Sequence, residues 1–326
     1  MPGKDTLRNQ LRYTNEMKRN ALHHGSIAVV VASLLWSVDG LLRTSLYSLP
    51  PVVIVAWEHA LGFVVLLPFL VMARKSFKKL SRPQWLAIAL VALLSGTAGT
   101  IFYTAALGQV YYIPFSVVVV LQQLNPVFAI ATAAILLKEK PSRTFFILTA
   151  VALVGAYLVS FPNLSINYTT GSGTVIAALY AVAAAASWGI GTAFSKYALK
   201  DTSYVQISAA RFGLTALFAL MLVPLLGAGP ALQTVNPTQW YSLLAITCST
   251  GLVALVIYYY GLQKIKASHA ATLELVWPLS SVVVGWVFLH QTLSATQLVG
   301  ALILLISTYV IGRSATDQTN KKHEWR

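Results

Sequence analysis

The chain has 326 residues, of which 57% are hydrophobic and only 10% charged, and its formal net charge is +14 at pH 7. Soluble globular proteins average about 25% charged residues, so this composition excludes a soluble domain and indicates an integral membrane protein. The single cysteine, Cys248, can form neither an internal disulfide nor a thiolate metal site, and we expect no metal and no cofactor.

Apolar segments of membrane-spanning length follow one another along the chain. A spanning helix needs roughly 20 apolar residues, because each residue adds about 1.5 Å and the hydrocarbon layer is about 30 Å thick. Prolines and polar stretches such as Pro50-Pro51 and Lys140-Pro141 separate the segments. The sequence therefore predicts an all-α membrane protein of ten transmembrane helices, at 27–48, 51–73, 85–108, 113–137, 143–161, 174–198, 204–226, 238–263, 269–289 and 295–312.

Lysine and arginine gather in alternate connections and at both ends of the chain. Of the 23, 21 lie before residue 27, in or beside the connections after the second, fourth, sixth and eighth segments, or after residue 312; Arg43 and Arg211 lie within segments. Positive loops mark the cytoplasmic side, so we expect residues 1–26 and 313–326 to be cytoplasmic tails. The basic charge is then a matter of topology and of anionic lipid headgroups, and does not indicate nucleic-acid binding.

The two halves of the chain resemble each other at an offset of about 152 residues. Ser33-Leu34-Leu35-Trp36 aligns with Ala185-Ala186-Ser187-Trp188, and Leu124-Asn125-Pro126 aligns with Val276-Trp277-Pro278. The offset predicts two repeats, residues 27–161 and 174–312. Because each repeat has an odd number of segments, the second would be inverted in the membrane, as in secondary transporters that work by alternating access. Chance resemblance between apolar helices is the alternative.

Titratable residues inside the predicted segments are candidates for a binding site. A charge at mid-bilayer costs about 2.5–3.5 kcal/mol, so such residues are expected to face the interior of the bundle. Trp36, Asp39 and Arg43 would share one helix face, where Asp39 and Arg43 bind a solute or only neutralise each other, and Arg43 is also near enough to the outer surface to reach it.

The second segment of each half carries a charge at an equivalent position. Glu58 and Arg211 either pair directly or each meet one end of a zwitterion. His59, next to Glu58, either titrates near neutral pH or is structural.

The fourth segment of each half has a proline near its middle, Pro126 or Pro278. Each proline would free the carbonyl four residues earlier, at Gln122 or Glu274. Kinked helices near the midplane are typical of transporter sites, although a packing kink has the same pattern. Glu274 is the candidate for proton coupling, since an intramembrane carboxyl group can exchange protons. The other residues expected around a central cavity are Asn125 and the aromatic residues Trp36, Tyr103, Trp188, Tyr258 and Trp277. For each aromatic residue taken singly, packing is the favoured alternative.

With these features the chain resembles the drug/metabolite transporter superfamily, in particular its ten-helix members with two EamA-like repeats. The resemblance rests on Trp36, Trp188, Arg211, the two prolines, and Lys138-Glu139-Lys140 after the fourth segment. It implies export or exchange of metabolites such as amino acids across the inner membrane. Glu58 stands where arginine is common, and His290-Gln291 replaces a second-repeat glutamate, so the substrate does not follow from the relatives.

The expected function is secondary transport of small polar or zwitterionic metabolites. An exporter of organic cations is the alternative, and it is favoured if Asp39, Glu58 and Glu274 all face the cavity unpaired. A membrane-embedded enzyme is less favoured, because the sequence has no metalloprotease motif, catalytic triad or phosphate-binding loop. A channel is less favoured because the repeat and its kinks indicate alternating access.

Overall fold

The computed structural model describes residues 3–72, 77, 79–108, 121–122, 124–160, 164, 173–277, 279–280 and 294–321. The predicted all-α class is confirmed, since these residues form helices joined by short connections and contain no strand. The longer helices are α1 (Gly3–Trp36), α3 (Pro51–Met72), α5 (Arg82–Val91), α6 (Thr100–Gly108), α8 (Asn125–Leu136), α9 (Arg143–Ser160), α10 (Gly173–Ala198), α11 (Tyr204–Leu225), α12 (Pro237–Ile246), α13 (Leu252–Lys264) and α16 (Ala295–Lys321). The shorter elements are α2 (Asp39–Arg43), α14 (Ala267–Leu273), the 3₁₀ helices η1 (Thr44–Leu46) and η4 (Gly229–Leu232), and the π-helical segments η2 (Ala92–Gly99) and η5 (Thr247–Gly251).

The chain is a multi-pass membrane protein. Among the described residues, six stretches, some of them made of successive helical elements, are long and apolar enough to cross a bilayer, and three shorter apolar helices, α8, α9 and α16, accompany them. Predicted segments 113–137 and 269–289 fall partly outside the described residues, so the count of ten remains a prediction. The six stretches are Arg19–Arg43, Pro51–Met72, Arg82–Gly108, Ile176–Ala198, Tyr204–Leu225 and Pro237–Lys264.

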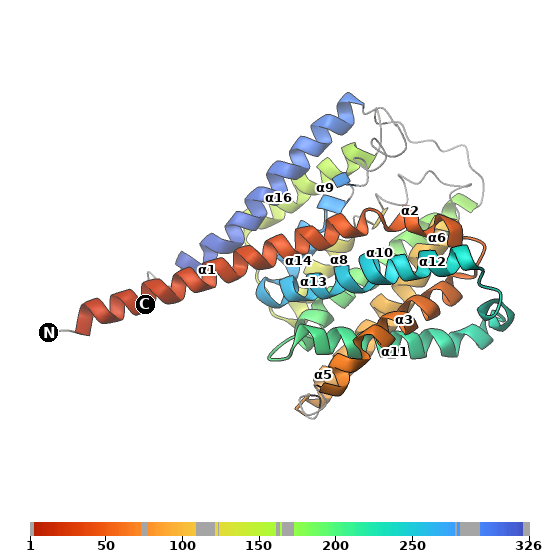
Figure 1. The fold of residues 1–326 in the computed structure, drawn as a ribbon. Coiled ribbons are helices and arrows are strands. Elements are labelled where there is room, and N and C mark those ends of the chain that lie inside the picture. The colour runs from red at the N-terminus through yellow and green to blue at the C-terminus, as the bar shows by residue number, and fades with distance from the viewer. Residues whose placement is uncertain are drawn as a thin grey trace.

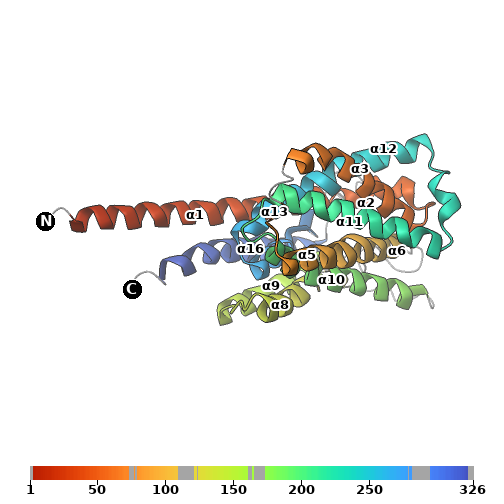
Figure 2. The same cartoon turned by 90° about the horizontal axis from the view of Figure 1, so that it is seen from below.

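Helices of the two halves pack against each other in reciprocal pairs. α3 lies along α11, α9 along α16, and α8 against α14, while α1 packs on α13 as α10 packs on α6. At the α3–α11 contact, a Cβ on Gly62 would touch the ring of Phe212, and a Cβ on Gly213 would touch the ring of Phe63. The N-terminal end of α1 and the C-terminal end of α16 project from the same end of the bundle (Figures 1 and 2).

The first predicted segment is broken and is not one continuous helix. α1 ends at Trp36, residues 37–38 form a turn, and α2 begins at Asp39. The hydroxyl of Ser37 donates to the carbonyl oxygen of Leu34 at 2.6 Å, a local bond that competes with the helical ladder. The spacing of Trp36, Asp39 and Arg43 predicted one shared helix face. This prediction is wrong, because the turn separates Trp36 from the other two residues.

The third and eighth segments each contain a π-helical stretch at equivalent repeat positions, η2 and η5. A π-helical stretch changes the carbonyl pairing of the helix and is frequent at functional sites. The carbonyl oxygen of Ala92 accepts from the hydroxyl of Thr215 at 3.2 Å, and that of Ser95 accepts from the indole Nε1 of Trp188 at 3.1 Å. In this way η2 is tied to α11 and also holds one aromatic side chain of the central cavity.

The fourth segments are broken where the prolines predicted a kink. Pro126 lies in the first turn of α8 and not inside a continuous helix. In the second half α14 ends at Leu273, and a turn follows at Glu274. The carbonyl oxygen of Glu274 was expected to be free. It is not, because it accepts from the backbone N–H of Trp277 at 2.9 Å. Pro278 lies outside the described residues.

Candidate functional site

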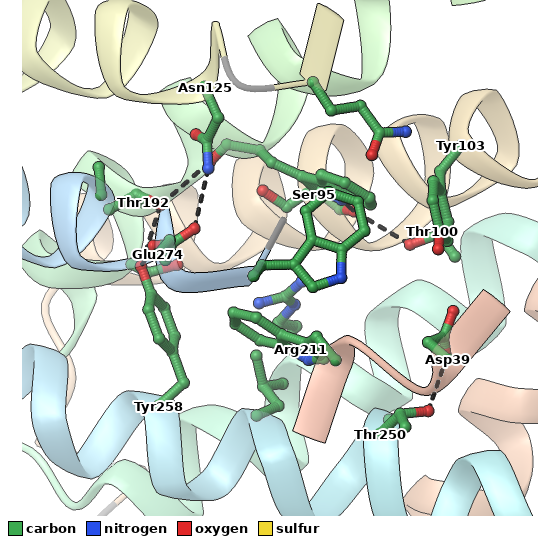
Figure 3. A pocket seen from close by; sticks show the side chains of 18 of the residues that line it. Asp39, Ser95, Thr100, Tyr103, Asn125, Thr192, Arg211, Thr250, Tyr258 and Glu274 are labelled. Carbon is green, nitrogen blue, oxygen red and sulfur yellow. Dashed lines mark hydrogen bonds between the residues drawn. The ribbon is translucent and has the colours of Figure 1, made fainter. Parts of the chain in front are cut away.

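A cavity of about 170 Å³ lies between the two halves of the chain. All the residues that the sequence predicted as solute-binding line this one cavity, together with Pro126; Figure 3 shows part of it. They come from elements far apart in the chain, and binding by any of them remains a prediction. The predicted residues around it are Trp36, Asp39, Arg43, Glu58, His59, Tyr103, Gln122, Asn125, Trp188, Arg211, Tyr258, Glu274 and Trp277.

Asp39, Arg43, Glu58 and Thr250 form a buried ionic group, here called the Arg43 cluster. Arg43 donates through Nε to Asp39 Oδ2 at 2.5 Å and through Nη2 to Glu58 Oε2 at 2.8 Å. Thr250 donates its hydroxyl to the second oxygen of Asp39 at 2.6 Å (Figure 3). Arg43 is 3% exposed, so it does not reach the outer surface. The expected Asp39–Arg43 pair is present, and Glu58 pairs with Arg43 and not with Arg211.

Arg211 points from α11 into the same cavity without a carboxylate partner among the described residues. Its Nη1 donates to the hydroxyl of Tyr259 at 2.8 Å, and its guanidinium lies 5.6 Å from the centre of that ring. Its buried Nε has no hydrogen-bond partner in the described part of the chain. His59 is held by a hydrogen bond and by packing: its Nδ1 lies 2.9 Å from the carbonyl oxygen of Val55, and its ring packs on Phe212.

Glu274, Asn125, Tyr258 and Thr192 form a second polar group, here called the Glu274 cluster. Tyr258 donates its hydroxyl to Glu274 Oε1 at 2.6 Å, and Asn125 donates through Nδ2 to Oε2 at 2.8 Å (Figure 3). The hydroxyl of Thr192 lies 3.2 Å from that of Tyr258. Neutral donors therefore hold this carboxyl group, and no basic side chain of the described residues forms an ion pair with it.

Aromatic rings cover much of the cavity wall. Trp36 at the end of α1 packs against Tyr258 of α13, with ring centres 5.2 Å apart. Tyr103 of α6 packs against Trp188 of α10 at 5.2 Å and against Trp277 at 6.4 Å. Tilted and edge-to-face contacts of this kind are favourable between aromatic rings, so these side chains support one another in the cavity wall.

Gln122 is a buried polar side chain of the cavity wall. It is 3% exposed, and neither its Oε1 nor its Nε2 has a hydrogen-bond partner within the described ranges. Oδ1 of Asn125 is also buried without a partner there.

The small polar residues of the cavity wall were not predicted from the sequence. Ser95 and Thr250 belong to the π-helical segments, and Thr100, Thr192 and Ser195 complete the set. Ser95 and Thr250 lie in glycine-containing polar stretches, Ser95-Gly96-Thr97 and Ser249-Thr250-Gly251, at nearly equivalent repeat positions. That shared interruption of two apolar segments is the signal that could have found them.

Comparison with known proteins decides the family. The profile of the EamA-like transporter family matches residues 23–161 and matches again over residues 175–313. The chain belongs to the EamA-like transporter family. This membership confirms the resemblance to the drug/metabolite transporter superfamily, and it makes the chain a transporter of that superfamily.

Individual relatives of this EamA-like transporter cover nearly the whole chain. The present chain is 31% identical over 291 residues to the riboflavin transporter ImpX of Fusobacterium nucleatum, and the match covers 89% of this chain and 97% of that one. The uncharacterized transporter YoaV of Bacillus subtilis is 22% identical over 287 residues, covering 87% and 95%. One solved crystal structure superposes with a TM-score of 0.71 at 18% identity, covering 90% of this chain and 98% of that one, so the fold is shared.

Proposed function

We propose that this protein transports a small solute with a planar aromatic ring system, by alternating access around the central cavity, and that a flavin such as riboflavin is its substrate. The observation that carries the proposal is the wall of Trp36, Tyr103, Trp188, Tyr258 and Trp277 around a few polar groups. Ligand sites are mostly apolar and aromatic, with a small number of polar groups that fix orientation.

The ring system of riboflavin is planar and uncharged, and its edge is polar. The charges of the Arg43 cluster neutralise one another in part, so an uncharged solute would not have to compensate them. The 31% identity to ImpX, a riboflavin transporter, supports the same substrate class.

A zwitterionic metabolite such as an amino acid is the second candidate, as the sequence led us to expect. It is favoured by one observation: Arg211 and Glu274 each lack an oppositely charged partner among the described residues. Arg211 would bind a carboxylate and Glu274 an ammonium group. The condition for an organic-cation exporter is not met, because Asp39 and Glu58 are both bound to Arg43.

We also propose the topology predicted from the sequence. The chain would cross the inner membrane ten times, as inverted repeats at 27–161 and 174–312, with cytoplasmic tails at 1–26 and 313–326 near anionic headgroups. The reciprocal helix pairs and the shared end of α1 and α16 support this arrangement (Figure 2). Transport would be export or exchange, coupled to protons through Glu274, and no chemical step is required.

Counterflow into proteoliposomes tests the substrate. Vesicles loaded with unlabelled solute receive labelled riboflavin, tryptophan or tetraphenylphosphonium outside, with and without a proton gradient. Riboflavin should enter faster than in protein-free vesicles. Folded protein that moves only tryptophan would support the second candidate, and protein that moves none of the three would overturn both.

A matched pair of variants ties the result to the cavity. Trp36→Leu removes an indole packed 5.2 Å from Tyr258 in the wall, whereas Trp240→Leu removes one packed 4.9 Å from Trp57 outside it. Trp36→Leu should slow riboflavin counterflow, and Trp240→Leu should leave it unchanged at equal protein content. Equal effects of the two substitutions would contradict a role for the aromatic wall.

A further inference from the structure

Gln122 is buried at an energetic cost that nothing in the described fold repays. Each buried polar atom without a partner costs about 1–3 kcal/mol, and native proteins seldom leave one unpaired. Both amide atoms of Gln122 are buried without a partner, since the residue is only 3% exposed and no described group bonds to it, and the residue lines the cavity. Its repeat equivalent Glu274 differs, because both of its carboxyl oxygens accept a hydrogen bond. A partner for Gln122 is therefore expected to come from the contents of the cavity.

The amide group of Gln122 has a chemical complement. Oε1 accepts and Nε2 donates in one plane, so together they match a ring edge on which an N–H stands beside a carbonyl group. Asn125 adds a second acceptor: its Nδ2 donates to Glu274 Oε2 at 2.8 Å, which leaves Oδ1 for another partner. Oδ1 is buried without a partner in the described part of the chain, and Asn125 lines the same cavity as Gln122.

The walls near these amides suit a flat ligand. Tyr103, Trp188 and Trp277 pack on one another around the same cavity, with ring centres 5.2 and 6.4 Å from that of Tyr103. A ring stacked on these side chains can present its polar edge to an amide in its plane, so stacking and edge recognition can act together.

We infer that Gln122 determines substrate specificity by binding the edge of a planar heteroaromatic ring on which an N–H lies next to a carbonyl group. In a flavin this edge is the pyrimidine-dione part of the ring system, with N3–H between two carbonyls. Oε1 accepts the N3 hydrogen, and Nε2 donates to the neighbouring carbonyl oxygen. This role rests on the proposed function and assigns the side chain that would read the ring.

The test compares riboflavin with 3-methylriboflavin, in which a methyl group replaces the N3 hydrogen. Binding to the purified protein is measured by the change in flavin fluorescence on titration. The wild type should bind riboflavin at least about tenfold more tightly, since the methyl group removes a donor and leaves the buried amide unpaired. Gln122→Met keeps the length of the side chain without its polar atoms, and it should bring the ratio of the two affinities close to one.

Two further variants keep the outcome interpretable. Gln206→Met makes the same substitution at a buried glutamine of α11 that does not line the cavity, and it should keep the wild-type ratio. Gln122→Asn retains the amide but withdraws it by one methylene, so it should also lose discrimination, and it replaces Gln122→Met if that variant does not fold.

The possible results separate this role from the proposed function. Folded wild type that binds neither flavin refutes flavin transport and this role with it. Wild type that prefers riboflavin, with Gln122→Met or Gln122→Asn preserving the preference, refutes the role of Gln122 alone and leaves flavin binding standing. An unpaired amide that serves only a water molecule would give that second result.

Discussion

Replacement of Arg43 by methionine should destabilise the protein strongly. Arg43 is the cation between two buried carboxylates, at 2.5 Å from Asp39 and 2.8 Å from Glu58, and the three residues are 3–5% exposed. Removing one partner of a buried ion pair costs about 3–5 kcal/mol, because the charge left behind is not compensated. At about 2 °C per kcal/mol, the apparent melting temperature should fall by roughly 6–10 °C.

The assay is the loss of folded protein after heating in detergent, followed by size exclusion. Arg19→Met is the control, because it removes an exposed arginine of α1 and should leave the melting temperature unchanged. The double variant Arg43→Met/Glu58→Gln should melt above Arg43→Met, since one of the two uncompensated carboxylates is gone. An Arg43→Met variant as stable as the wild type, or a double variant with strictly additive losses, would refute the coupled cluster.

Three other substitutions test separate parts of the structure. Glu274→Gln should abolish the pH dependence of counterflow, because an amide cannot exchange a proton; unchanged pH dependence would exclude Glu274 as the coupling site. Glu139→Ala should lower stability by about 1–2 kcal/mol in the same heating assay, because Glu139 accepts from the backbone N–H of Ala267 at 2.9 Å and caps α14; unaltered melting would show that this cap contributes nothing. Gly191→Ala should cost about 1–3 kcal/mol, since the added Cβ would meet the hydroxyl of Ser95, and a variant that melts like the wild type would mean that α10 and η2 separate freely.

The ends of most helices were predictable from hydropathy and from the prolines and polar stretches between the apolar segments. The predicted segments 51–73 and 204–226 correspond to Pro51–Met72 and Tyr204–Leu225, and 143–161 corresponds to Arg143–Ser160. The agreement has a physical reason, because the bilayer sets the length of an apolar run and proline begins a helix without the loss of a needed donor.

Breaks inside a segment were not predictable in the same way. The predicted segment 27–48 runs through Trp36 and Asp39 without proline or glycine between them, and the turn there includes a local hydrogen bond from the Ser37 hydroxyl. The π-helical segments are also invisible to an apolar period, although their glycines are consistent with close helix contacts at Gly96 and Gly99.

The cavity lining was largely predictable, and its bonding was not. Intramembrane charges are expected to face inward, so a position in the core was predictable for Asp39, Arg43 and Glu58. Spacing alone identified the Asp39–Arg43 pair, whereas the Arg43–Glu58 bond depends on how α2 meets α3. The two bonds that Glu274 accepts likewise join residues brought together only by the tertiary fold.

The most direct test of the central claim is whether the cavity opens in turn to both sides of the membrane. Ser195→Cys places a thiol in the cavity wall of a Cys248→Ser protein, which has no other cysteine. A membrane-impermeant maleimide should label it when added to either face of oriented vesicles, and riboflavin should slow labelling from both faces. Labelling from one face only, or labelling that riboflavin leaves unchanged, would contradict alternating access through this cavity.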